Sequence, residues 1–531
     1  MAGRVIARVQ SCTLVGIDAV PIEVECVVLP GQLPAFNIVG LPDTSGREGA
    51  VRIRSALKSI RHDVPLKRVT VNLAPADLRK HGSALDLPTA LAILIGDGTY
   101  GGEELDGLLV LGELGLDGSI RPVRGVLAAA MLAHRRGMRG VLVPDACAGE
   151  ALLVEPLEVY AANHLSQVVA AFQGEPMPLP ARAGARRRRR RVFTADMADV
   201  RGQSFARSAI QLAVAGGHNL LLSGPPGTGK TMLARRIPSV LPAMTRAESL
   251  ETTKVYSSLG LANDLVDERP FRAPHHTITG PALLGGGSPP HPGEISLAHN
   301  GVLFLDELPE FSRGTLEALR QPLEDRAITI GRVHGTIHLP ASFLLVAAAN
   351  PCPCGWLWSG VKECQCSSFA IDRYRAQLSG PLLDRIDLQV GVHPVPLAVL
   401  RDEKPGEPSA AIRERVAAAR ERQHARLAPY ELSCNAEMPS RVLRECCRLT
   451  TACERELEKL VDERKSLSAR SIDRILKVAR TIADLDGRAD LCPDDLIEAA
   501  TYRALDPVTE IISPAPDPTL VQKRITAPAP S

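Results

Sequence analysis

Three short apolar runs in the middle of the chain each end in polar or charged residues. They cover residues 219–222, 302–305 and 343–349. Continuous apolar runs of this length are typical of strands buried on both faces of a parallel sheet. Because ligands bind beyond the carboxyl ends of such strands, we expect the residues that follow these runs to meet in one site.

The first third of the chain shows a different pattern, in which strand-like runs alternate with helical ones. The strand-like runs occupy residues 12–16, 22–28, 69–73 and 141–143, and the helical patterns occupy residues 45–59 and 88–95. Both periodicities in one stretch predict an α/β domain. We place this domain at residues 1–175.

A change in composition follows this domain. Residues 176–195 form a linker rich in Pro, Gly and Arg, and residues 186–191 are all arginine. Such a run is usually a solvated segment, and a clamp for DNA phosphates is the alternative. The Pro-rich end of the chain, residues 513–531, is expected to be disordered. Between the linker and this tail we expect an α/β core at 196–395 and a further domain at 396–512.

A phosphate-binding loop follows the first of the central apolar runs. The motif G-x-x-x-x-G-K-[ST] lies between that strand-like run and a helical stretch, as Gly224, Pro225, Pro226, Gly227, Thr228, Gly229, Lys230 and Thr231. In this context the backbone N–H groups surround phosphates, the lysine contacts the β- and γ-phosphates, and the hydroxyl reaches Mg²⁺. The sequence therefore predicts ATP and Mg²⁺ as cofactors.

The other two runs supply the remaining parts of an ATPase site. Asp306 and Glu307 follow the second run, where a Walker B pair is expected: Asp306 would hold Mg²⁺ and Glu307 would polarise the attacking water. Two solvated carboxylates after a core strand are the alternative. Asn350 ends the third run and is predicted to sense the γ-phosphate and the water.

Length, charge and hydropathy limit the class of protein. A chain of 531 residues is long enough for three to four domains. Lys and Arg number 62 against 60 for Asp and Glu, so a nucleic-acid surface would have to be a local patch. No stretch approaches the roughly 18 apolar residues of a membrane span, and no signal peptide begins the chain. We therefore expect a cytoplasmic protein.

Four of the twelve cysteines are spaced like metal ligands. Cys352, Cys354, Cys364 and Cys366 form a C-x-C and a second C-x-C within a short insertion at residues 351–367. Four thiolates at this spacing can close a tetrahedral structural Zn²⁺ site. Free thiols and an iron–sulfur cluster are the alternatives. Most of the other cysteines have apolar neighbours and are expected to be reduced.

The N-terminal domain resembles the Lon-protease-like domain. The resemblance lies in residues 111–118 and 121–126. That family cleaves peptides with a Ser–Lys dyad, and the alignment places Ala84, or at best Ser83, at the nucleophile position. The helix after Gly125 has no lysine. Because a serine without a basic partner is a poor nucleophile, we expect a binding or assembly module without peptidase chemistry.

The central block resembles the magnesium-chelatase-related AAA+ proteins, and together with the Lon-like domain it matches the ComM/YifB family. The resemblance lies in residues 271–277, 303–311, 349–355 and 379–387 and covers nearly all of residues 1–510. It implies an AAA+ core of the helix-2-insert type, an α-helical lid at 396–512 and a homo-hexameric ring. Better-studied members are implicated in DNA branch migration during natural transformation, with recombination proteins as possible partners.

The resemblance also implies two arginines that act on nucleotide. The segment at 382–387 is similar to the one that carries the trans arginine finger of minichromosome-maintenance helicases, which makes Arg385 the expected finger. A structural ion pair with Asp384 or Asp387 is the alternative. Arg470, at the start of a lid helix, is the expected second sensor, and Arg474 one turn later is the competing choice.

Two loops are expected to contact DNA in the pore of such a ring. His275 and His276 lie in a glycine-rich loop that resembles the helix-2 insert, and metal binding is the alternative role for them. Strand-like residues 327–330 and 336–339 flank a turn that carries Arg332 and His334, which is a β-hairpin pattern. A basic and polar hairpin tip can grip phosphates.

Three functions fit these patterns. The favoured one is an ATP-driven hexameric DNA motor, a branch-migration helicase in homologous recombination. The second is the metal-insertion ATPase subunit that the chelatase resemblance suggests, against which stands the lack of an acidic metal-binding domain in the sequence. The third is an AAA+ protein-remodelling or regulatory module. Stimulation of ATP turnover by DNA would favour the first function. Dependence on a metal–porphyrin partner would favour the second, and stimulation by unfolded protein would favour the third.

Overall fold

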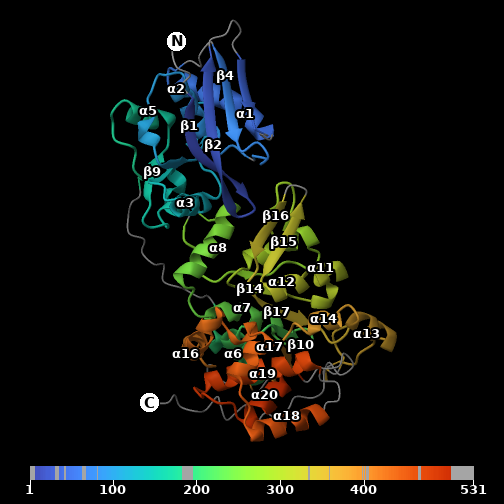
Figure 1. The fold of residues 1–531 in the computed structure, drawn as a ribbon. Helices are drawn as coiled ribbons and strands as arrows, with labels where there is room; N and C mark the ends of the chain where they lie inside the picture. Colours follow the sequence, from blue (N-terminus) through green and yellow to red (C-terminus); the bar gives the residue numbers. More distant parts are fainter. Residues whose placement is uncertain are drawn as a thin grey trace.

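The computed structural model places an N-terminal α/β unit, a central parallel-sheet core and a C-terminal helical bundle along the chain (Figure 1). It describes residues 6–29, 35–40, 44–62, 67–80, 82–181, 195–262, 264–332, 335–357, 359–360, 362–396, 399, 401, 406–463 and 468–503. The predicted linker arginines at 186–191 and the predicted tail at 513–531 lie outside the described residues.

A mixed sheet of seven strands organises the N-terminal unit, in the order β3-β4-β2-β1-β5-β8-β9. The strands are β1 (Ala7–Val15), β2 (Asp18–Leu29), β3 (Ala35–Val39), β4 (Arg68–Ala74), β5 (Leu108–Val110), β8 (Gly140–Pro144) and β9 (Glu158–Ala162). A separate small ladder pairs β6 (Glu113–Leu114) with β7 (Ile120–Arg121). Buried positions alternate with partly buried ones along β4 after the exposed Arg68, as expected for a strand with one face in the core.

Helices pack on this sheet and complete its core. They are α1 (Thr44–Ser59), α2 (Asp86–Gly96), α3 (Val126–Arg135), α4 (Ala148–Ala151) and α5 (Leu165–Phe172). Helix α2 is buried from Asp86 to Ile95, because it packs against β1, β2 and α1. The predicted strands at 12–16, 22–28, 69–73 and 141–143 and helices at 45–59 and 88–95 are confirmed, with β1 beginning earlier than expected.

A five-stranded parallel sheet forms the core, in the order β11-β14-β17-β10-β18. The strands are β10 (Leu220–Ser223), β11 (Phe271–Arg272), β14 (Val302–Leu305), β17 (Leu344–Ala349) and β18 (Leu388–Gly391). All residues of β14 and β17 are buried, which explains why their sequences are continuous apolar runs without alternation. The three strands predicted from those runs are confirmed and lie next to one another in the order β14-β17-β10.

Helices and short ladders surround the core sheet. The helices are α6 (Ser204–Gly216), α7 (Lys230–Val240), α8 (Arg246–Ser258), α9 (Gly280–Leu284), α10 (Glu294–Leu297), α11 (Arg313–Ala318), α12 (Arg320–Asp325), α13 (Ser368–Arg375) and α14 (Gly380–Leu383). The ladders pair β12 (Gly285–Gly286) with β13 (His291–Pro292) and β15 (Ala327–Arg332) with β16 (Gly335–Pro340). The second ladder is the hairpin predicted from the alternating residues at 327–330 and 336–339.

The C-terminal region is helical, as expected for a lid. It contains α16 (Ser409–Leu427), α17 (Ser440–Cys446), α18 (Thr451–Glu463), α19 (Ala469–Leu485) and α20 (Pro493–Thr501). Its apolar residues share one buried cluster with α6, α7 and the strands of the core sheet. A buried His218 joins the two parts, because its ring lies 2.8 Å from the Thr481 hydroxyl of α19 and 3.3 Å from Asp387 beside β18.

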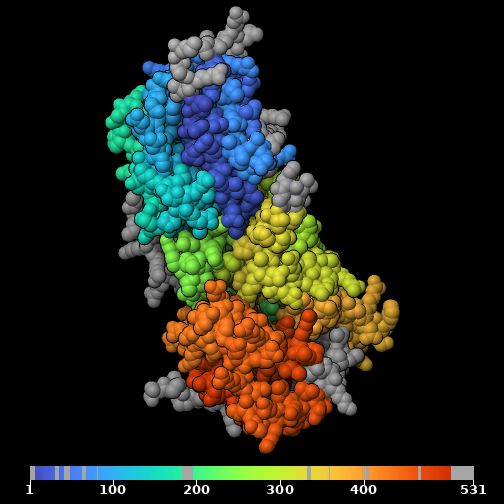
Figure 2. All heavy atoms as spheres, in the orientation of Figure 1, coloured from blue at the N-terminus to red at the C-terminus, as the bar shows by residue number. Residues whose placement is uncertain are grey.

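The N-terminal unit rests on α8 and on the hairpin β15–β16 (Figures 1 and 2). The buried Glu150 accepts hydrogen bonds from the Ser257 hydroxyl of α8 and from the backbone N–H of Leu127, and the Gly125 N–H donates to the Ser257 carbonyl. Ile17, in the turn between β1 and β2, belongs to the same apolar cluster as the hairpin. The unit is therefore docked by both polar and apolar contacts.

None of the helices in the described part of the chain is long and apolar enough to cross a membrane.

Candidate functional site

The carboxyl edge of the core sheet gathers the polar residues that follow the apolar strands. Ser223 of β10 pairs with Ala349 of β17, and Leu305 of β14 pairs with Ala347, so the chain leaves all three strands at the same edge. Glycine-rich residues 224–229, Asp306 and Asn350 come next in the chain. The sequence prediction that these residues meet in one site is confirmed by the contacts between them.

The loop after β10 needs its glycines. Gly227 and Gly229 have φ angles of 78° and 93°, in the left-handed region that side chains rarely adopt. A Cβ atom on Gly224 would lie 2.2 Å from the carbonyl oxygen of Val392, so this position has no room for a side chain. The loop leads into α7, whose first residue is Lys230. An unpaired helix N-terminus above a glycine-rich loop is the usual arrangement for binding phosphates.

Lys230 follows this loop, and its ammonium group donates hydrogen bonds to oxygen atoms that phosphate oxygens could replace. Its Nζ donates to the carbonyl oxygens of Gly224 and Pro225 at 2.6 and 2.9 Å and to Oδ1 of Asn350 at 3.1 Å. Burial lowers the pKa of Lys230 to about 8, although the carboxylates of Asp306 and Glu307 act in the opposite direction. The contact brings Asn350, the predicted sensor, to the predicted phosphate-binding lysine.

Thr231 and Asp306 provide the donor set for a magnesium ion. The Thr231 hydroxyl donates to Oδ2 of Asp306 at 2.7 Å. A hydroxyl and a carboxylate beside bound phosphates are the ligands that Mg²⁺ takes in P-loop sites, so the residues present fit this ion. Glu307, the next residue, has an exposed side chain and a φ angle of 52°. This left-handed turn separates its side chain from that of Asp306.

His276 contacts the same glutamate. Its Nδ1 atom lies 3.5 Å from Oε2 of Glu307, and the ring of His275 lies 4.1 Å from that of His276. Both histidines come from the loop between β11 and α9. Sequence reasoning assigned them to DNA and missed the contact with Glu307, because nothing in the sequence shows that this loop lies over the end of β14.

The hairpin β15–β16 is present, but its predicted contact residues are only partly described. Arg332 ends β15 and pairs in register with Gly335, while nothing is described of its side chain. His334 lies outside the described residues. The hairpin as an element is therefore established, and the contacts of its tip stay a prediction.

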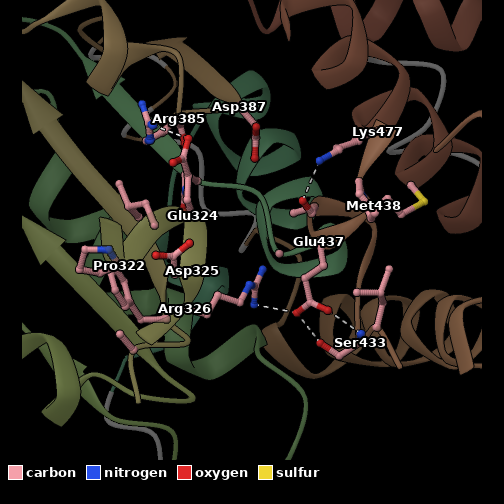
Figure 3. Close-up of a pocket in the computed structure, with 18 of the residues that line it drawn as sticks. Pro322, Glu324, Asp325, Arg326, Arg385, Asp387, Ser433, Glu437, Met438 and Lys477 are labelled. Atoms are coloured by element: carbon pink, nitrogen blue, oxygen red, sulfur yellow. Dashed lines mark hydrogen bonds and ion pairs between the residues drawn. The ribbon is translucent and has the colours of Figure 1, made fainter. Parts of the chain in front are cut away.

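Arg385 lines a cavity at the amino ends of the core strands. The cavity, of about 620 Å³, is lined by Asn219, which precedes β10, by Phe343, which precedes β17, and by Asp387, which precedes β18. These residues mark the amino ends of the strands, opposite the edge that carries Lys230. The guanidinium of Arg385 is buried and pairs with Glu324 of α12 (Figure 3).

The two candidates for the second sensor are placed differently. Arg470 is exposed in the first turn of α19. Arg474, one turn later, pairs with Asp387 and lines the same cavity as Arg385. The pKa of Asp387 is held well below its usual range: its burial would raise the pKa, and the nearby charge of Arg474 and a hydrogen bond from His218 outweigh that effect.

The four cysteines of the insertion lie together. One sulfur atom from each lies within 4.8 Å of the other three, with Sγ–Sγ separations of 3.4 Å for Cys352–Cys354, 3.7 Å for Cys352–Cys364 and 3.6 Å for Cys354–Cys364. Tetrahedral ligands at about 2.3 Å from Zn²⁺ are roughly 3.8 Å apart, so these thiols fit a structural zinc ion.

Among the described residues of the serine loop, Ser83 and Lys80 do not form a dyad. The Ser83 hydroxyl donates to the carboxylate of Glu113, and the ammonium of Lys80 donates to the carbonyl of Pro75. Helix α3 contains no lysine. Both polar groups near the predicted nucleophile position are therefore engaged in contacts other than a Ser–Lys pair.

Comparison with known proteins gives matches along most of the chain. Residues 196–400 match the family described as magnesium chelatase, subunit ChlI, residues 23–147 match subunit ChlI of Mg-chelatase, and residues 406–503 match the C-terminal part of that subunit. The competence protein ComM of Haemophilus influenzae is 43% identical over 94% of this chain and 98% of its own length. The uncharacterized protein YifB of Escherichia coli is 41% identical over 94% of this chain and 97% of its own. Lon protease 2 of Bacillus subtilis is 28% identical over 29% of this chain and 32% of its own.

Proposed function

The chain belongs to the YifB and ComM family of magnesium-chelatase-like AAA+ ATPases, and from that premise we propose that it is an ATP-driven ring motor that moves DNA branches. The AAA+ family membership implies an ATPase, and the relative named as a competence protein favours a DNA substrate. The observation on which ATP hydrolysis depends is the cluster of Lys230, Asp306, Glu307 and Asn350 at the carboxyl edge of the sheet.

Each of these side chains has a proposed task in hydrolysis. Lys230 exchanges its three oxygen acceptors for the β- and γ-phosphates. Thr231 and Asp306 would hold a Mg²⁺ ion, which would supply positive charge beside the phosphates. Glu307 accepts a hydrogen bond from the attacking water and orients it, and the Asn350 amide contacts that water or the γ-phosphate. These tasks need no covalent intermediate with the protein.

The position of Arg385 and Arg474 at the amino ends of the core strands is consistent with assembly into a ring. Arg385 and Arg474 line a cavity at the amino ends of the strands and so lie away from the Lys230 of their own chain. In a head-to-tail hexamer this edge faces the nucleotide of the next subunit, where Arg385 acts as the finger. Arg470 stays the proposed second sensor, and Arg474, which lines the same cavity as Arg385, is the competing choice.

Two elements are proposed to contact DNA. The tip of hairpin β15–β16, with Arg332 and His334, grips phosphates in the pore. The loop with His275 and His276 is the second. In the structure, which contains no DNA, His276 of this loop lies 3.5 Å from Glu307. DNA binding to this loop would draw His276 from Glu307 and release the carboxylate to orient water, which links substrate binding to hydrolysis.

A structural zinc ion is proposed for Cys352, Cys354, Cys364 and Cys366. The short separations between the thiol sulfur atoms support it. Four protein thiolates leave no open position on the ion, so its role is to hold the insertion in shape and not to take part in hydrolysis.

A metal-insertion ATPase subunit is the second candidate, because the matching families are named after magnesium chelatase. An AAA+ protein-remodelling or regulatory role is the third, and the N-terminal unit would serve it as a binding module. Dependence of ATP turnover on a metal–porphyrin partner would favour the second, and stimulation by unfolded protein the third.

Strand exchange on branched and on linear DNA with ATP tests the proposal. The wild-type chain should extend exchange on branched DNA, and Glu307→Gln should bind the same DNA without extending it. Arg332→Ala should keep basal ATPase and lose DNA stimulation, while Arg373→Ala, an exposed arginine of α13 outside the hairpin, should keep both. ATP turnover that branched DNA leaves unchanged would reject the DNA motor.

A further inference from the structure

The cysteine insertion begins directly beside the nucleotide site. Asn350 follows β17 and touches Lys230 at 3.1 Å, and Cys352 comes two residues later. Cys352 is completely buried, whereas the other three cysteines are partly exposed. The insertion is therefore anchored at Cys352, the cysteine closest in sequence to the predicted sensor Asn350.

The insertion also packs against the phosphate-binding loop itself. A Cβ atom on Gly355 would lie 2.7 Å from Cδ and 3.3 Å from Cγ of Pro226, and 3.8 Å from Cγ of Asn350. Pro226 is the central, exposed residue of the P-loop. Gly355 thus lies against both the P-loop and the sensor, and this contact leaves no room for a side chain.

The far end of the insertion returns to the same place. Residues 362–367 lead into α13, whose Tyr374 is buried. Burial, and after it the negative charge of Glu310, raises the pKa of Tyr374, while a hydrogen bond with the backbone of Asn350 opposes the rise. Asn350 is therefore contacted by Gly355 inside the insertion and by Tyr374 in the helix that follows it.

Short turn hydrogen bonds accompany the cysteines in the insertion: the Gly355 N–H donates to the Cys352 carbonyl, and the Ser359 N–H donates to the Trp356 carbonyl. Within its described residues, 351–357, 359–360 and 362–367, there is no helix and no strand. Loops of this kind take a fixed shape when metal binding supplies the free energy that regular hydrogen bonding does not. The position of Gly355 on Pro226 then depends on whether the four thiolates hold a metal ion.

We propose that the metal-bound Cys352–Cys354–Cys364–Cys366 insertion braces the P-loop through Gly355 and Pro226, so that loss of the metal weakens ATP binding. Gly355 is a positioning residue in this scheme, and the ion remains remote from the phosphates. The inference rests on the proposed function only in requiring that the P-loop binds ATP.

Two glycines of the insertion provide a matched pair of variants. Gly355 and Gly360 have φ angles of 79° and 67°, so an alanine is strained at either position. Only Gly355 touches the P-loop, because no described atom lies within 4 Å of a Cβ on Gly360. Gly360→Ala therefore reports the effect of backbone strain alone.

The experiment measures binding of a fluorescent ATP analogue to the full chain without DNA, together with zinc content by elemental analysis. Gly355→Ala should keep its zinc and lose about tenfold in affinity, whereas Gly360→Ala should keep both zinc and affinity. Equal affinities of Gly355→Ala and the wild type would overturn the brace. Loss of affinity in both glycine variants would also overturn it, since strain would then be the cause.

Metal removal tests the same inference without a substitution. A chelator should lower the affinity of the wild type for the analogue, and added Zn²⁺ should restore it, with circular dichroism confirming that the helices persist. Unchanged affinity after zinc loss would reject the brace while leaving the proposed ATPase intact. A wild-type chain with zinc that fails to bind the analogue would instead reject the proposed function.

Discussion

Nδ1 of His276 lies 3.5 Å from Oε2 of Glu307, which joins the glycine-rich loop after β11 to the carboxylate that follows β14. A hydrogen bond at this distance is weak, but an imidazole beside the carboxylate competes with water for it. The side chain of Glu307 is about half exposed, at 52%, so it has space to leave the histidine. The pair thus connects a proposed DNA-contacting loop with the proposed water-orienting group.

Replacing His276 should free this glutamate. We expect His276→Ala to raise ATP turnover without DNA and to reduce the stimulation that DNA produces, because Glu307 no longer has to be released. Steady-state ATPase rates with and without branched DNA provide the measurement. His275→Ala is the control, since the ring of His275 lies beside that of His276, whereas only His276 pairs with Glu307 among the described residues. Lower basal turnover in His276→Ala would contradict a restraining role.

Variants of Lys230 and Glu307 should have different effects on nucleotide binding and on hydrolysis. Lys230→Ala removes the charge that faces the phosphates and should abolish nucleotide binding. Glu307→Gln keeps size and polarity but loses the water-orienting carboxylate, so binding should persist while turnover falls by at least about 10²-fold. Calorimetry and a phosphate-release assay measure the two effects. Normal turnover in Glu307→Gln would remove that residue from the mechanism.

The low pKa of Lys230 predicts proton uptake on ATP binding. Without nucleotide, Lys230 has a pKa of about 8, so above that pH its side chain is mostly neutral. Phosphates favour the charged form and raise the pKa again, so ATP binding at about pH 9 takes up a proton, while at about pH 7 the lysine is already charged. Affinity should therefore fall as the pH rises through 8. Binding heats at pH 9 that do not depend on the ionisation enthalpy of the buffer would rule out this coupling.

The position of Arg385 predicts complementation between subunits. Arg385→Ala should bind ATP and hydrolyse it poorly, because the finger acts on the neighbouring site. Mixing it with Lys230→Ala protein should restore some turnover, since some interfaces then pair an intact P-loop with an intact finger. The alternative is that Arg385 serves only its ion pair with Glu324. In that case Arg385→Ala lowers the melting temperature and mixing restores nothing.

The cysteine cluster predicts about one zinc ion for each chain. Cys352→Ser and Cys366→Ser should each lose the ion, because three remaining thiolates close the tetrahedral site incompletely. Elemental analysis of protein purified without chelator measures the ion. Cys147→Ser is the control, as Cys147 is a buried thiol of the N-terminal unit whose pKa burial raises to about 11. Wild-type protein without any bound metal would contradict the assignment.

The sequence by itself determined the strands and the residues at their ends. The runs at β10, β14 and β17 are apolar because both faces of these strands are buried, and parallel strands deliver whatever follows them to one edge. Lys230, Asp306 and Asn350 could therefore be assigned to one site before any contact was known. The four cysteines could also be identified from the sequence, because the spacing of metal ligands is a local property of the chain.

Only the tertiary structure decided how separate segments meet. The contacts of His276 with Glu307, of Gly355 with Pro226 and of Glu150 with Ser257 join residues whose sequence neighbourhoods carry no matching pattern. The sheet also places Arg385 at the edge opposite Lys230, which decides that it lies away from the nucleotide site of its own chain. The physical reason is that burial periodicity is written in each segment, whereas a contact between loops depends on where the packed elements direct them.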